Sequence, residues 1–192
     1  MATLPSCPVF IAAAIVAGVV IGLLRGGHVG NLADASFRLW PVLVLGVAVQ
    51  SVAAFMSVGA VVLILASYVL LVLFAGTNLQ HPGMGIVFIG IALNVAVIAA
   101  NGGMPVRADA IVAAGIVERD EIATLDFGNK RHLEGPDDRL TLLGDIVPVP
   151  GAEEVLSFGD LAMSVGVATV LVNLLRRGRR RELEQSEPAA NP

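Results

Sequence analysis

The chain has 192 residues, of which 56% are hydrophobic and only 15% are charged, and its mean hydropathy is +0.81. Soluble domains ordinarily carry about 25% charged residues, so a water-soluble fold of this length could not hide so much apolar surface. Between Leu39 and Gly76 the only ionisable side chain is Tyr68. This composition excludes an ordinary soluble domain, and we expect an integral membrane protein.

Apolar segments in chain order predict five membrane spans, because a bilayer core about 30 Å thick takes roughly 20 apolar residues to cross as a helix. The predicted spans are residues 9–24, 39–56, 58–75, 84–100 and 155–175. The apolar run 39–75 would reach about 55 Å as one helix, so it must fold back, and we expect the turn at Met56-Ser57-Val58-Gly59.

The predicted fold is therefore an all-α membrane protein with about five transmembrane helices. Four of them fall in residues 1–101, an extracytoplasmic loop follows at 102–154, and the fifth helix is 155–175. Residues 176–192 are expected to form a basic, disordered tail.

The first apolar segment is expected to be a retained span. Met1 to Cys7 carries no lysine or arginine, whereas a cleaved signal peptide needs a basic N-terminal region. Gly18, Gly22 and Gly26 recur at every fourth position of this region. Small residues at that spacing let two helices approach closely, either within one chain or between two copies.

The placement of arginines predicts the orientation, since positively charged residues are retained on the cytoplasmic side. Five of them directly follow the last apolar segment: Arg176, Arg177, Arg179, Arg180 and Arg181. We therefore place the C-terminus in the cytoplasm, and five spans put the N-terminus outside. The arginine cluster is expected to contact anionic lipid headgroups and not nucleic acid. The 102–154 loop, with eleven acidic and five basic residues, then lies outside the cell membrane.

Polar side chains within apolar segments are the candidates for specific interactions. Asn94 and Asn101 lie seven positions apart and so share one face of the fourth span. They predict either hydrogen bonds between helices or the lining of a ligand cavity. Asp160 is the only carboxylate in a predicted span, near its outer end, where either it or Ser157 could cap the helix.

The outer loop divides into three parts. Residues 109–122 are rich in alanine and isoleucine and predict a short amphipathic helix on the membrane surface. Residues 126–138 predict an irregular segment. Prolines in residues 140–150 argue against a helix and favour an extended or re-entrant segment.

Two short units in the outer region are alike, because Gly144-Asp145 and Gly159-Asp160 each set an aspartate after a glycine, between apolar residues. Two carboxylates that are brought together could share a proton and activate water, as in aspartyl hydrolysis. Asp145 and Asp160 are therefore the candidate catalytic residues if the protein is an enzyme.

Four blocks of sequence carry a resemblance to a known family: Asn101-Gly102-Gly103-Met104-Pro105-Val106, Lys130-Arg131-His132, Leu143-Gly144-Asp145-Ile146-Val147-Pro148 and Leu156-Ser157-Phe158-Gly159-Asp160. In this order they resemble a bacterial membrane family catalogued as domain of unknown function 5317. The likeness covers most of the chain and is densest between residues 101 and 166. It implies a bacterial multi-span membrane protein and implies no activity.

Three functions are consistent with these patterns. The first is a non-enzymatic component of the bacterial envelope, with a protein partner left open. The second is a small transporter or channel subunit with a path lined by Asn94, Asn101 and Asp160, and the third is an intramembrane aspartyl hydrolase using Asp145 and Asp160. The single cysteine and three separated histidines give no metal-ligand spacing, so no metal or cofactor is expected.

Overall fold

The computed structural model describes residues 8–33, 35–56 and 59–186, and within these ranges the chain is mainly helical. The α-helices are α1 (Pro8–Leu24), α2 (Trp40–Ala53), α3 (Ala60–Thr77), α4 (Met84–Asn101), α5 (Ala108–Ala113) and α6 (Phe158–Ser186). The strands are β1 (Met104–Val106), β2 (Arg131–Leu133), β3 (Val147–Val149) and β4 (Glu154–Leu156). Short 3₁₀ turns are η1 (Val29–Leu32), η2 (Ile122–Thr124) and η3 (Thr141–Leu143).

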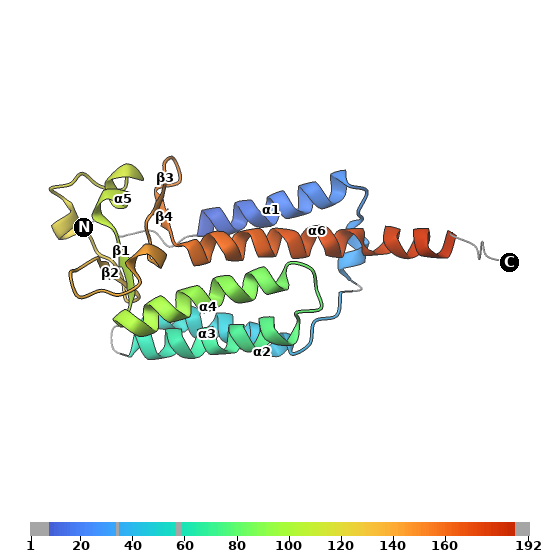
Figure 1. Cartoon of the computed structure of the whole chain (residues 1–192), viewed down its shortest axis with the longest axis horizontal. Helices are drawn as coiled ribbons and strands as arrows, with labels where there is room; N and C mark the ends of the chain where they lie inside the picture. The colour runs from blue at the N-terminus through green and yellow to red at the C-terminus, as the bar shows by residue number, and fades with distance from the viewer. Residues whose placement is uncertain (1–7, 34, 57–58, 187–192) are drawn as a thin grey trace.

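Five of the helices form one elongated bundle, with the segment between α4 and α6 folded over one end of it (Figure 1). We call this end the loop end and the opposite end the tail end. Helix α6 packs against both α1 and α4, and α3 packs against both α2 and α4. Consecutive helices of the bundle run in alternating directions, so α1, α3 and α6 all start at the loop end (Figure 1).

Among the residues that the structure describes, three helical stretches are long and apolar enough to cross a membrane: Ala60–Thr77, Met84–Asn101 and Phe158–Arg177. The apolar stretches of α1 and α2 are shorter, and α2 has only 14 residues. The expectation of a mainly helical, membrane-compatible protein is therefore confirmed at this level.

The long apolar run 39–75 folds back as expected, although α2 is shorter than the predicted span 39–56. Helix α2 ends at Ala53, and α3 begins after Gly59, whose φ of 75° favours a glycine. Residues 57 and 58 lie outside the described residues. Pro41 lies in the first turn of α2, where its missing N–H breaks no helical hydrogen bond.

Glycines set the spacing of α6 from its two neighbours. A methyl group at Gly18 of α1 would lie 2.8 Å from the Cα atom of Ala168, and one at Gly90 of α4 would lie 2.6 Å from the carbonyl oxygen of Gly159. The glycine pattern of the first segment therefore serves a contact within the chain, between α1 and α6. Gly26, the third glycine of the pattern, lies beyond the end of α1, in a turn where its φ is 79°.

The N-terminus of α1 is held by a residue from the folded loop. The carboxylate of Glu154, in β4, accepts hydrogen bonds from the backbone N–H groups of Val9 at 3.0 Å and Phe10 at 3.1 Å. These N–H groups have no partner within their own helix, and a negative charge is favourable at this end. Glu154 is buried, so this cap fixes the start of α1 against the loop.

The loop is more structured than predicted, and the all-α expectation is wrong for it. Strands β1 and β2 pair in parallel, and β3 and β4 pair antiparallel. The helix expected over 109–122 is confined to α5, because Gly115 turns the chain with φ 78°. The loop also has its own small core of buried apolar side chains: Val106, Ala110, Ile111, Ala114, Ile122, Leu125 and Val155. The apolar face of α5 packs into this core.

The last helix is displaced relative to the predicted span 155–175. Residues 154–156 pair as β4, and α6 begins only at Phe158. At its other end α6 continues to Ser186, so residues 176–186, expected to be disordered, are helical. The remaining tail residues, 187–192, lie outside the described residues.

Candidate functional site

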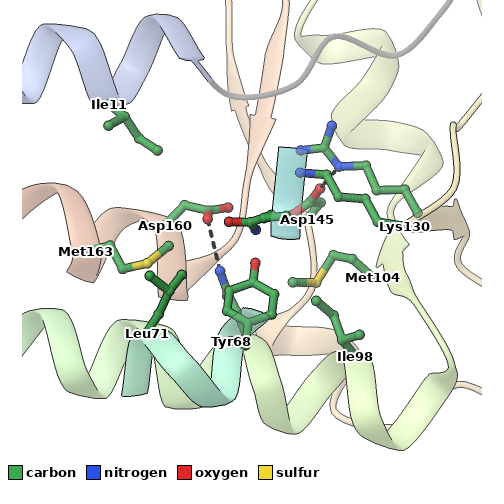
Figure 2. Close-up of a pocket in the computed structure, with 12 residues that line it drawn as sticks. Ile11, Tyr68, Leu71, Ile98, Met104, Lys130, Asp145, Asp160 and Met163 are labelled. Atoms are coloured by element: carbon green, nitrogen blue, oxygen red, sulfur yellow. Dashed lines mark hydrogen bonds and ion pairs between the residues drawn. The ribbon is translucent and has the colours of Figure 1, made fainter. Parts of the chain in front are cut away.

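A cavity of about 380 Å³ lies at the loop end, where the folded loop meets the helices (Figure 2). Its polar lining residues are Gln50, Tyr68, Asn94, Lys130, Arg131, Asp145 and Asp160. Its apolar lining residues are Ile11, Leu71, Ile98, Met104 and Met163. The five bundle helices and the loop all contribute, so the cavity exists only in the folded chain. We call it the outer pocket.

Asp160 enters the pocket from the first turn of α6. Its Oδ2 atom accepts a hydrogen bond from the backbone N–H of Ser157 at 3.1 Å, and the Ser157 Oγ atom accepts one from the Asp160 N–H at 3.0 Å. This reciprocal pair is a capping box, which satisfies N–H groups at the start of a helix. Both residues considered as caps from the sequence therefore act together.

Asn94 joins α4 to this cap. Its Nδ2 atom donates to Asp160 Oδ1 at 3.0 Å. The Ser157 hydroxyl lies 2.9 Å from Asn94 Oδ1 and 2.7 Å from Asp160 Oδ2, so its single proton can go to either acceptor. A methyl group at Gly159 would lie 1.9 Å from Asn94 Oδ1. The glycine before Asp160 is thus required for Asn94 to reach the carboxylate.

Asp145 enters from the loop, where its backbone continues the small sheet. Its N–H donates to the carbonyl of Pro105 at 2.9 Å, and its carbonyl accepts from the N–H of Arg107 at 3.0 Å. A methyl group at Gly144 would lie 2.6 Å from the Pro105 oxygen. The glycine of this second unit therefore has the same kind of role as Gly159, because each lets another segment approach next to the aspartate.

Asp145 forms a buried ion pair with Arg131, with 2.7 Å between Oδ2 and Nε and side-chain exposures of 1% and 5%. The two residues lie on opposite edges of β1, since β2 pairs Arg131 with Met104 and Asp145 bridges Val106. Burial raises the pKa of Asp145 to about 6, although the positive charge of Arg131 opposes the rise. Lys130 reaches the same region, alongside Asp145 (Figure 2).

Of the four residues singled out from the sequence, three lie together and one does not. Asp145, Asp160 and Asn94 all line the outer pocket. Asn101 is the last residue of α4, where its side chain exchanges hydrogen bonds of 2.7 and 2.8 Å with the backbone of Arg139. It shares a face with Asn94 but lies about 10 Å further along the helix, since each residue rises about 1.5 Å. Asn101 therefore anchors the loop and does not line the pocket.

Sequence reasoning did not assign Lys130, Arg131, Tyr68 or Gln50 to a site. Arg131 is brought to Asp145 by the pairing of strands only three residues long, which leave almost no periodic signal. Tyr68 stood out as the only ionisable side chain between Leu39 and Gly76, and its hydroxyl points into the pocket (Figure 2). An ionisable group within such a segment is a usable signal for a functional site.

The fold and the site together define a class: a mainly helical protein with membrane-compatible helices, in which a folded loop closes a charged pocket over one end of a helix bundle. A family model described as a family of unknown function, DUF5317, matches residues 34–172. The chain belongs to this family, as the sequence blocks indicated. The match includes every lining residue of the pocket except Ile11. No curated protein and no solved structure matches the chain.

Proposed function

We propose that this protein is a non-enzymatic integral membrane component of the bacterial envelope that binds a ligand in the outer pocket. The observation that carries the proposal is the pocket itself, a cavity of about 380 Å³ that five helices and the folded loop line with polar and apolar side chains. Ligand pockets in proteins commonly have volumes of about 300–1,000 Å³ and combine apolar walls with converging polar groups that fix the ligand.

The proposed topology has five spans, with the loop outside and the C-terminus in the cytoplasm. Helices α1 and α2 are short, but they lie within the same bundle as the three long helices (Figure 1). They also expose large apolar side chains, among them Val16, Val20, Val44 and Leu45, which a lipid environment would accommodate. This arrangement supports assigning α1 and α2 as spans too.

The distribution of arginines supports the orientation. Arg177 contacts His81 in the connection between α3 and α4, with 2.5 Å between Nη2 and Nδ1. The backbone of Arg38 lies in the same region, where its N–H donates to Asn78 Oδ1 and its carbonyl accepts from Asn78 Nδ2, both at 2.8 Å. Both arginines therefore lie at the tail end, opposite the acidic loop, as expected for a cytoplasmic surface facing anionic lipid headgroups.

Binding has more support than hydrolysis. An aspartyl dyad needs two carboxylates that share a proton, because like charges at close range cannot both ionise. Here Asp145 is paired with Arg131, and both oxygens of Asp160 accept hydrogen bonds from Asn94 or Ser157. Each aspartate thus has partners of its own. Hydrolysis remains the second candidate, because both aspartates line one cavity.

A transporter or channel has less support. Helices α4 and α6 approach backbone to backbone at Gly90 and again at Gly166, where a methyl group would lie 2.6 Å from the backbone nitrogen of Val87. Such close contact leaves no room for a polar path between these helices below the pocket.

Native mass spectrometry on the full-length protein, purified in mild detergent and incubated with a bacterial membrane extract, tests the proposal. We expect a retained ligand whose mass stays constant over hours. Leu71→Trp should abolish retention by filling the pocket, whereas Val69→Trp should not, because Val69 is on the same helix but 61% exposed. Absence of any retained ligand would contradict binding. Conversion of the ligand to products, stopped by Asp160→Asn, would instead favour the hydrolase.

A further inference from the structure

The tail end of α6 is tied to both of the connections that pass it. The carbonyl of Leu175 accepts hydrogen bonds from the N–H of His28 at 3.0 Å and from Asn31 Nδ2 at 2.6 Å, both in the connection between α1 and α2 (Figure 1). Two residues further along α6, Arg177 contacts His81 in the connection between α3 and α4. We call the pair of His81 and Arg177 the tail latch.

The tail latch can form in only one protonation state of His81. Arg177 Nη2 lies 2.5 Å from His81 Nδ1. A guanidinium stays charged in proteins and has only N–H donors, so Nδ1 must be the acceptor. A neutral imidazole has one acceptor nitrogen, whereas a protonated imidazole has none. Protonation would therefore replace this hydrogen bond by a contact between two donors that both carry a positive charge.

The surroundings of His81 also favour the neutral ring. His81 is only 4% exposed, and its Nε2 atom makes no hydrogen bond of regular geometry with the described residues. The ring packs against that of Phe37, with 4.7 Å between the ring centroids. Burial and then the positive charge of Arg177 lower the pKa of His81 below its ordinary value of 6.5, although the backbone carbonyl of Ser36 opposes them.

The ionisable groups around the latch would not compensate a second positive charge. In the ranges 24–33, 35–40, 76–84 and 172–177, which form the tail end of the described chain, every ionisable side chain is a base. Besides the latch residues, these bases are Arg25, His28, Arg38 and Arg176. Asp34 lies outside the described residues. A charged His81 ring would therefore meet like charges, which disfavour its charged form.

We propose that the tail latch is an acid-sensitive switch: neutral His81 holds the tail end of α6 against the α3–α4 connection, and protonation of His81 releases it. The released ring would bind the proton more tightly, because it would reach water and leave Arg177. The latch is therefore favoured above about pH 6.5 and weakens as the pH falls through the lowered pKa of His81. This inference goes beyond the proposed binding function and does not depend on it.

Electron paramagnetic resonance tests the release on the full-length protein in lipid nanodiscs. In a Cys7→Ala background, Gln80→Cys and Arg176→Cys place two nitroxide labels at exposed positions beside the latch. We expect one short distance between the labels at about pH 8, and a longer or broader distribution at about pH 5, where an ordinary histidine is charged. The change should reverse when the pH is raised again.

Three further variants assign the response to His81. His81→Gln keeps an oxygen acceptor for Arg177 but does not titrate, so the distance should stay short at both pH values. His28→Gln removes an exposed histidine at the same end of the molecule, and this variant should respond as the parent protein does. Asp34→Asn should also respond as the parent does, because the switch needs no carboxylate.

A titration of the histidine side chains by NMR separates the switch from a merely structural contact. The His81 signal, identified by its loss in His81→Gln, should titrate with a midpoint below 6.5. Arg177→Gln keeps a donor without the charge, so it should move this midpoint upward.

Four results would overturn the inference: equal distance distributions at both pH values in the parent protein, the same change in His81→Gln, loss of the change in Asp34→Asn, or an unmoved His81 midpoint in Arg177→Gln. None of these measurements involves a ligand of the outer pocket. The latch can therefore fail while ligand retention stands, and the proposed binding function can fail while the latch stands.

Discussion

The two Gly-Asp units show how far single residues could be interpreted from the sequence. The sequence predicts either Asp160 or Ser157 as the cap of the last helix, and the hydrogen bonds between these two residues form one shared cap. This cap joins residues three positions apart at the start of one helix, so it could be predicted from the local sequence. The ion pair of Asp145 with Arg131 could not be predicted in this way, because it depends on two segments meeting across β1.

Glu154 is a long-range cap that sequence inspection did not reveal, since 144 and 145 residues separate it from the N–H groups that it binds. We expect Glu154→Gln to lower the free energy of unfolding by about 0.5–2 kcal/mol, because it removes a charge from the N-terminus of α1. Thermal unfolding in detergent would measure this. The neighbouring Glu153→Gln is the control, because Glu153 is exposed, and equal effects of the two changes would argue against the cap.

At the scale of elements, glycine spacing predicted one helix contact and missed another. The repeat of Gly18 and Gly22 lies within one segment and was visible in the sequence. The contact of α4 with α6 depends on Gly90 and Gly159, which lie in different helices, so no single-segment pattern reveals it. Which two glycines meet is decided by how the helices pair, and that pairing is set by the whole bundle.

Helix α4 offers a matched test of this packing. Gly90→Leu should destabilise the protein by about 1–3 kcal/mol or more, because its side chain would meet the backbone of Gly159 and the backbone nitrogen of Met163. Gly85→Leu should have little effect, since a Cβ atom there has no other atom within 4 Å. Melting temperatures in detergent would compare the two. A similar loss in both variants would contradict the close approach of α4 and α6.

At the scale of the whole molecule, the apolar segments predicted the helical bundle, because an uninterrupted run of about 20 apolar residues is a strong signal for a membrane-spanning helix. The folded loop was largely missed. Its strands have three residues each and pair across distant positions, as β1 does with β2. Its prolines and glycines indicated turns but could not say which segments would meet. The pocket forms between this loop and the bundle, so it could not be predicted either.

The central claim is that the folded loop lies on the extracytoplasmic side of the membrane and that the turn between α3 and α4 lies on the cytoplasmic side. Cysteine accessibility tests it directly in a Cys7→Ala background, since Cys7 is the only native cysteine. Asp120→Cys places a thiol in the exposed loop, and Gln80→Cys places one at the exposed tail end. With a membrane-impermeant thiol reagent, we predict labelling of the Asp120→Cys variant in intact bacterial cells and of the Gln80→Cys variant only after permeabilisation. Labelling of both in intact cells, or the reverse pattern, would contradict the proposed topology.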